Sequence, residues 1–335
     1  TTGDFNTAIG NISGFRNQTG VNNTYVGYGS GMGASGNSHS DNTGLGFKSL
    51  NAITTGEDNV AIGSEAMAVH TTGGKNVAIG YQVMLDTNEG STSLGSSENV
   101  FIGYQVASGT WADVASNHNV GIGNDVMRGA LNGALYNVAV GSEALMSVTT
   151  GDANIVAGYQ AGNDITTGEA NICIGNRAGD EFDAENYNIF IGEDAGGGAI
   201  NGADKCIAIG KSALDGAITQ DGTIAIGHDS LSGVTSGNYN LAIGFEAAKG
   251  ITTGTSNIAI GYQAFDSANG AEDNNIAIGV SALGDADHDD LERNIAIGHY
   301  AGDGMGAFAN LDNIFIGHGA GGGTWVNNNC DANVG

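Results

Sequence analysis

The chain has 335 residues, of which 59 are Gly and none is Pro, and its 9 Lys and Arg against 36 Asp and Glu give a formal net charge of −27. The missing Pro excludes a collagen triple helix, and so few cations exclude the basic stripe of a nucleic-acid-binding protein. An anionic membrane surface would repel the chain, and no apolar run reaches the ~18 residues of a membrane span. We therefore expect neither nucleic-acid binding nor membrane insertion.

A five-residue core, Asn-Ile-Ala-Ile-Gly or a close variant, recurs from Gly10, where its first copy ends, to Gly317, where its eighteenth ends. Nine of the seventeen intervals between the closing glycines are 17 residues long. That period is too short for a helix pair, and β-branched residues with a Gly in every unit favour strands. The sequence predicts an all-β fold, a parallel β-solenoid of about 18 coils with a 17-residue repeat, as one domain over residues 1–335. Since an incomplete unit occupies 333–335, we expect a fragment of a longer fibre.

Each position of the five-residue core predicts a different structural role. The first is Asn in 16 of 18 units, with Cys206 and Thr223 as exceptions, which predicts a ladder of stacked amides. The second and fourth are apolar and share one face of a strand, which we assign to the coil interior. The third, Ala in ten units, then faces a second copy, so we expect the Ala column with Phe101, Phe190 and Phe315 to line the axis of a homotrimer.

The closing Gly is present in every unit, which indicates a positive φ or a close backbone approach. Three residues later a small residue follows in most units, with a polar residue before it. This spacing predicts a second, half-buried strand in each coil. A Thr-Thr-Gly turn, as in 166–168, then leads to the next Asn.

The segment 253–264, Thr-Gly-Thr-Ser-Asn-Ile-Ala-Ile-Gly-Tyr-Gln-Ala, resembles the head repeat of trimeric autotransporter adhesins of the YadA type. Similar repeats occur in phage tail fibres. The resemblance covers nearly all of residues 1–335, and it implies a left-handed β-roll wound as a trimer and acting in attachment. The family's usual head unit is shorter than 17 residues, so wider coils are expected here.

No nucleophile elbow, phosphate-binding loop, zinc-protease motif or paired-Cys site occurs in the sequence, and we expect no enzyme, cofactor or metal. Weak metal signals remain: a column of His228, His299 and His318, and the acidic segment 285–290, which lacks the Gly and Glu of an EF-hand. We interpret both as solvent-facing. The three cysteines, Cys173, Cys206 and Cys330, are interpreted as free thiols.

The leading functional hypothesis is a structural and adhesive trimeric fibre, extracellular on a virion or cell surface, with a receptor or glycan and other fibre or virion proteins as partners. The alternatives are a single-chain solenoid that binds ice or polysaccharide through its Thr rows, and a polysaccharide-cleaving enzyme. The two longest intervals place extra residues in 86–98 and 108–118. Because loops on a rigid scaffold commonly carry binding, we expect Trp111, His118 and Tyr136 to contact a receptor; packing of Trp111 against a neighbouring coil is the other interpretation.

Overall fold

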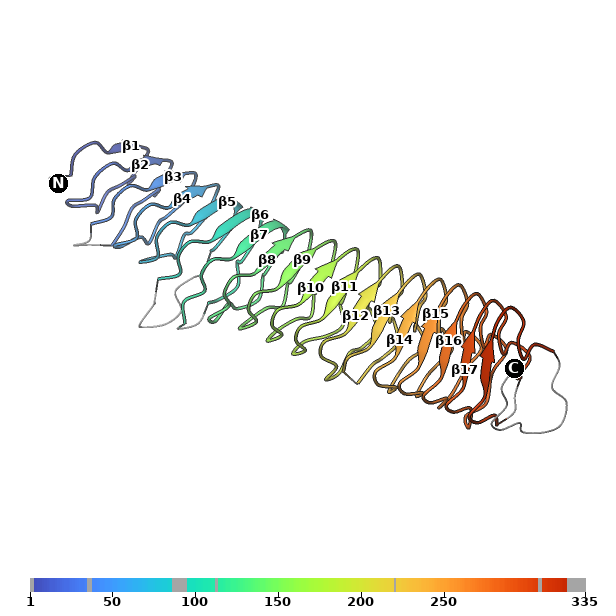
Figure 1. Ribbon diagram of the computed structural model, residues 1–335. Coiled ribbons are helices and arrows are strands. Elements are labelled where there is room, and N and C mark those ends of the chain that lie inside the picture. Colours follow the sequence, from blue (N-terminus) through green and yellow to red (C-terminus); the bar gives the residue numbers. More distant parts are fainter. Residues whose placement is uncertain are drawn as a thin grey trace. The chain divides into compact units, whose positions relative to one another are not determined.

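Figure 1 shows the computed structural model of the chain, which describes residues 3–34, 38–85, 95–111, 114–219, 221–306 and 309–323. The chain forms two compact units, residues 1–170 and residues 171–335. Each unit is a parallel β-solenoid with one short strand per coil. The described residues contain no helix, and hence none long and apolar enough to cross a membrane. The all-β solenoid is confirmed, whereas its organisation as one domain stays a prediction.

The described part of the first unit, blue to green in Figure 1, holds nine strands: β1 (Thr7–Ile9), β2 (Thr24–Val26), β3 (Thr43–Leu45), β4 (Val60–Ile62), β5 (Val77–Tyr81), β6 (Val100–Tyr104), β7 (Val120–Asn124), β8 (Val138–Val140) and β9 (Ile155–Ala157). The described part of the second unit also holds nine: β10 (Ile172–Ile174), β11 (Ile189–Ile191), β12 (Ile207–Ile209), β13 (Ile224–Ile226), β14 (Leu241–Ile243), β15 (Ile258–Ile260), β16 (Ile276–Ile278), β17 (Ile295–Ile297) and β18 (Ile314–Ile316). Within a unit each strand pairs in parallel with the next, like position beside like, as Ala208 beside Ala225.

The first position of the repeat forms the predicted ladder of buried amides. Asn137 donates from Nδ2 to Oδ1 of Asn119 in the preceding coil (3.1 Å) and to the carbonyl of Gly151 (2.8 Å). Its own Oδ1 accepts the backbone N–H and Nδ2 of Asn154 at 2.9 and 3.0 Å. The same pattern recurs over 240–313. The ladder holds the coils in register and supplies partners to polar groups that water cannot reach.

The closing glycines stack on one another, which confirms the expectation of a close approach. Gly244 has φ +144°, and a Cβ built on it would lie 2.1 Å from the carbonyl oxygen of Gly261 in the next coil. The other closing glycines from Gly10 to Gly298 in the described chain meet the next coil in the same way wherever that contact is described. No side chain fits at this position, so Gly is required by both φ and space.

The assignment of the two strand faces is wrong and must be reversed. The third position lies inside the coil: Ala61, Ala208 and Phe101 have no exposed surface. The second and fourth positions face outward and are half-buried or exposed along every described strand, as in Ile189 and Ile191. The physical reason is space. The interior wall opposite each strand stands so close that Ala fills the gap, while Ile is accommodated outside.

Two large residues at the third position lie against glycine on the opposite wall. Phe190 packs against Gly179 and Gly196, where a Cβ would lie 2.7 and 2.6 Å from its ring. Tyr25 lies against Gly31 in the same way, at 2.4 Å. In several coils with Ala at the third position, the wall position four residues after the closing Gly carries a large side chain such as Leu145. Glycine on the wall thus makes room for the rings of Phe190 and Tyr25, as close packing requires.

The expected second strand of each coil is a run of turns. In the fourth coil Glu65 and Met67 have φ of 59° and 53°, in the left-handed region. Their N–H groups still bond across coils: Glu65 donates to Phe47 of the preceding coil (2.8 Å) and Met67 to Val83 of the following coil (2.9 Å). Residues with positive φ therefore alternate with residues of negative φ in place of the pleated conformation of a β-strand. The backbone hydrogen bonds between neighbouring coils are kept. The small residue three positions after the closing Gly is buried as expected, as at Ala66.

Candidate functional site

The outward side of the second unit's strands is an uncharged apolar surface. We define the aliphatic face as the second and fourth positions of β10 to β18: Ile172, Ile174, Ile189, Ile191, Ile207, Ile209, Ile224, Ile226, Leu241, Ile243, Ile258, Ile260, Ile276, Ile278, Ile295, Ile297, Ile314 and Ile316. All are half-buried or exposed. Contiguous apolar patches of this kind mark surfaces that bind another molecule. A chain with a net charge of −27 thus carries one face without charge.

In the first unit the second-position column begins with Thr7, Thr24 and Thr43 and continues as Val and Ile, whereas the fourth-position column is aliphatic throughout. At the edge of the outward side, the position after the closing Gly carries stacked rings. Tyr81 and Tyr104 stack at 5.4 Å between centroids and 18° between planes. In the second unit Phe245 and Tyr262 stack at 5.3 Å and 8°. The rings face one another, so each covers its neighbour rather than presenting a flat platform.

A second line of exposed side chains occupies the residue before the first position of each repeat. We call it the corner row. All its described non-glycine members have φ near +60°, so the chain turns sharply there and aims the side chain outward. Four consecutive members of the first unit contact one another. Lys75 Nζ lies 3.5 Å from Glu98 Oε1, and Glu98 Oε2 lies 3.0 Å from His118 Nδ1. His118 stacks on Tyr136 at 4.9 Å with 2° between the ring planes.

Of the three predicted receptor contacts, two are exposed and one is buried. His118 and Tyr136 are exposed neighbours in the corner row, with Tyr136 59% exposed. Trp111 is only 1% exposed; its Nε1 donates to the Ala107 carbonyl at 3.1 Å, and its ring meets Phe101 edge-on. The prediction for Trp111 required an exposed indole, and the structure places the indole inside the coil, in agreement with the packing interpretation.

Of the two predicted loops, residues 86–94 and 112–113 lie outside the described residues. The corner row also contains two exposed tyrosines that sequence reasoning missed, Tyr187 and Tyr239, at 58% and 65% exposure. Their signal was available: each stands directly before an Asn of the repeat, as Tyr136 does. The three tyrosines are separated by three repeats each time.

The histidines and cysteines of the described chain do not gather at one place. Within it, no group of three or more His, Cys, Asp or Glu is placed to hold a metal ion. His299 and His318 meet edge-on at 5.3 Å, and His228 stacks on Phe245. Cys173 and Cys206 are buried free thiols, and burial raises the pKa of both; Cys330 lies outside the described residues.

Two carboxyl groups stand out by their surroundings. Burial raises the pKa of Asp180 to about 6. Glu272 is fully buried and accepts the N–H groups of Asn269 and Gly270 at 3.2 and 3.1 Å, which uses its carboxylate to close a turn. Burial also raises the pKa of Glu272. Neighbouring carboxylates add to this effect, Glu181 and Asp194 at Asp180 and Asp287 at Glu272.

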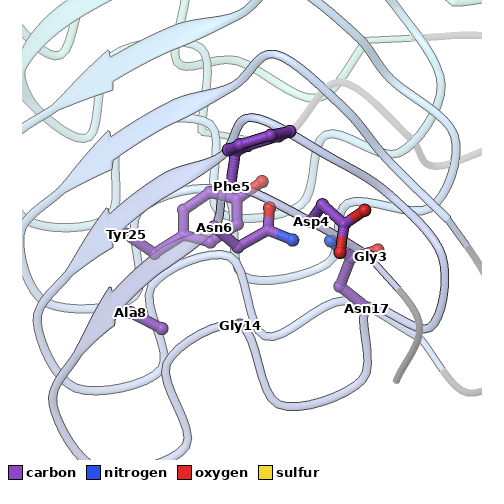
Figure 2. Close-up of a pocket in the computed structure, with 8 residues that line it drawn as sticks. All are labelled: Gly3, Asp4, Phe5, Asn6, Ala8, Gly14, Asn17 and Tyr25. Carbon is purple, nitrogen blue, oxygen red and sulfur yellow. The ribbon is translucent and has the colours of Figure 1, made fainter.

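A hollow of about 400 Å³ lies at the end of the first coil. Figure 2 shows the Phe5, Asn6 and Tyr25 side chains gathered around it. Ala8, whose counterparts are buried in later coils, is exposed here. The hollow therefore opens into the interior of the first coil, and its polar lining comes from Asp4, Asn6, Asn17 and Tyr25.

Two of the surfaces described above fit a macromolecular partner: the aliphatic face and the corner row. Comparison with protein-family models and with curated proteins found no match for the chain.

Proposed function

We propose that the chain is a structural and adhesive fibre segment that works as a homotrimer on the outside of a virion or cell. The resemblance of its repeat to adhesin heads and phage tail fibres supports this proposal. So does the repetitive fold itself, since a solenoid extends by adding coils and gives a surface of regular length. Its partners are a receptor or glycan and other fibre or virion proteins.

The observation that carries the proposal is the aliphatic face. Eighteen Ile and Leu side chains on one uncharged surface are unfavourable in water. Full burial of an exposed Ile or Leu is worth about 1.5–3 kcal/mol, and these half-buried or exposed side chains can still gain a part of that each. A second and third copy of the same chain provide an identical apolar surface. The proposed trimer interface therefore consists of the second and fourth positions, in place of the Ala column expected from the sequence.

The net negative charge of the chain supports a trimer whose surface outside the aliphatic face is exposed to solvent. Three copies carry 3 × −27 = −81 at neutral pH, and such charge keeps assemblies soluble and apart. Attachment is assigned to the corner row, where His118 and Tyr136 remain the proposed receptor contacts. Trp111 is buried and contacts Phe101 and the Ala107 carbonyl, so it is not among the proposed contacts.

The single-chain alternative, which binds ice or polysaccharide through Thr rows, is weakened by the Thr hydroxyls. Thr54 and Thr149 donate from Oγ1 to the carbonyls of Thr71 and Thr166 in the next coil, at 3.0 and 3.1 Å. These hydroxyls therefore hold neighbouring coils together. In each of these two Thr pairs, one hydroxyl is already used within the protein and is not available to bind an external ligand.

The test is the oligomeric mass of the intact chain and two variants. Ile243→Glu places three charges per trimer on the proposed interface and should yield a folded chain of monomeric mass, because unpaired charges are costly to bury. A milder variant, Ile226→Thr with Ile243→Thr and Ile260→Thr, keeps β-branched residues and should lower trimer affinity. Ser236→Glu makes the same charge change on an exposed turn and should stay trimeric.

A wild-type chain of monomeric mass would overturn the homotrimer. So would an Ile243→Glu variant that stays trimeric with unchanged thermal stability. Ala242→Glu distinguishes the two strand faces: Ala242 is buried inside the coil, so this variant should lose its coil structure rather than dissociate as folded monomers. Binding of the wild-type trimer to candidate host cells tests the adhesive part separately.

A further inference from the structure

The corner row places an exposed tyrosine at every third coil through the middle of the chain, at Tyr136, Tyr187 and Tyr239. Exposed tyrosines at one repeat position are not explained by packing, because Ala153 and Ser256 occupy the same position in other coils. Nor does backbone conformation require Tyr, since the φ near +60° is disfavoured for any residue with a Cβ. The tyrosines therefore point to binding.

The surroundings of Tyr239 leave its ring accessible. In the preceding coil the corner position is Gly222, and a Cβ built there would lie 3.3 Å from the Tyr239 ring. In the following coil it is Ser256, which is exposed. With only a Gly and a Ser as its neighbours in the row, the ring is 65% exposed. The ring thus lies close to Gly222 and remains largely exposed, unlike the mutually stacked Phe245 and Tyr262.

Tyr136 in the first unit has a similar arrangement on one side. His118 stacks on one face of its ring. The next member of the row is Ala153, whose methyl group is too small to cover the other face. A flat ligand can therefore stack on that face, as it can at Tyr239.

Polar groups able to bind hydroxyls flank the tyrosines. Asn238 precedes Tyr239, and Asp221 and Thr255 precede its two neighbours in the row. The Asp221 carboxylate accepts the N–H of Asp204 through Oδ1 at 2.9 Å, which fixes the carboxylate at the exposed edge. An apolar ring surrounded by a few oriented amide, carboxylate and hydroxyl groups matches the usual composition of a small-ligand site.

We propose that the corner row binds an extended, uncharged polysaccharide, with sugar rings stacked on Tyr187 and Tyr239 and their hydroxyls bonded to the flanking polar groups. The net charge of −27 and the Asp221 carboxylate near Tyr239 disfavour anionic polysaccharides, and Lys205 is the single cation between the two tyrosines in the row. Tyr187 and Tyr239 lie three coils apart in the second unit, a separation of about 14 Å at the strand spacing of a β-sheet. One extended chain can therefore contact both rings, and such double contact multiplies a weak affinity.

This inference rests on the proposed attachment function and names its ligand class. The test measures binding of the full chain to immobilised neutral polysaccharides (dextran, mannan, laminarin and cellulose) and to anionic alginate. At least one neutral polysaccharide should bind, and alginate should not. The double variant Tyr187→Ala with Tyr239→Ala should weaken binding about tenfold or more, whereas Tyr→Phe at both positions should retain most of it because the ring is kept. Alanine is native to this row at Ala153, so the fold accepts it.

Tyr262→Ala is the matched control, because Tyr262 is also half-exposed but stacks on Phe245 outside the corner row; it should bind as wild type does. The inference is overturned if no neutral polysaccharide binds, or if the double Ala variant binds equally well. Competition by phosphocholine but by no free sugar would also overturn it, since a cation would then be the ligand. If wild type and double Ala variant bind host cells equally, the polysaccharide inference fails and attachment stands; if the wild type binds no cells, attachment itself fails.

Discussion

Removal of one amide from the buried ladder should open the solenoid locally, and Asn257 is the best place to test this. Asn257 Nδ2 donates to Asn240 Oδ1 (3.2 Å) and to the Glu272 carbonyl (2.6 Å), and its Oδ1 accepts the backbone N–H and Nδ2 of Asn275 (2.9 and 3.2 Å). Asn257→Ala removes all four bonds. Asn240 Oδ1 keeps the Asn257 backbone N–H (2.9 Å), and Asn275 Nδ2 keeps the Leu291 carbonyl (2.8 Å).

Two buried groups therefore lose these bonds, the Asn275 N–H and the Glu272 carbonyl. A buried polar group left without its bond costs about 1–3 kcal/mol, so the variant should lose about 2–4 kcal/mol of local stability after some relaxation. Because solenoid stability is a sum of repeat and nearest-neighbour terms, the loss should centre on β14 to β16. Hydrogen exchange followed by mass spectrometry should show protection in these strands falling by about 30-fold or more, since 1.4 kcal/mol is a factor of ten.

Two controls accompany this variant. Asn257→Thr should be milder, because Thr223 occupies the ladder position naturally and is buried there. Ser236→Ala, on an exposed turn two coils before Asn257, should leave exchange unchanged. If Asn257→Ala exchanges like the wild type in β14 to β16, the buried ladder does not stabilise the coils and the reasoning fails.

Two further predictions concern the interior and the glycine stack. Burial lowers the pKa of His39 to about 4 from about 6.5 in the unfolded chain, so the folded state holds it neutral and acidification favours unfolding. His39 alone should cost the first unit about 2 kcal/mol between pH 7 and pH 5, and buried His70, whose pKa is also lowered, adds to the loss. Urea unfolding at both pH values, together with NMR titration of the imidazole, checks this, and an imidazole that titrates near 6.5 contradicts it. Gly244→Ala should lower the thermal midpoint sharply because its Cβ would lie 2.1 Å from a carbonyl oxygen, whereas Gly202→Ala, with φ +88° but open space, should lower it only slightly; equal midpoints would refute the close approach.

The period and the chemistry of the repeat could be predicted from the sequence. A unit of 17 residues with β-branched residues at its core can form only short strands in stacked coils. The Asn column predicts its own ladder, because an amide carries both a donor and an acceptor and can bond to an identical neighbour. The Gly column predicts a position without room for a side chain, and the contacts of Gly244 confirm it.

The direction of the strand faces could be decided only by the tertiary structure. Alternation separates the third position from the second and fourth, but it does not say which side is inside. The larger side chains were expected inside because burial of apolar area stabilises. The interior is too narrow for them, and the pairing of Phe190 with Gly179 and Gly196 across it shows how closely its volume is matched.

The same limit applies to the candidate site. Length alone indicated extra residues around Trp111, but whether an indole on an extra segment points outward depends on what it can pack against, and Phe101 provides that contact. Tyr187 and Tyr239 were overlooked because their shared position before an Asn of the repeat becomes apparent only when the coils are compared with one another. The sequence by itself determined the coils, their spacing and the ladders, because these depend on residues that repeat. The tertiary structure decided which side chains are buried and which are presented, because that depends on the space between walls that are far apart in the chain.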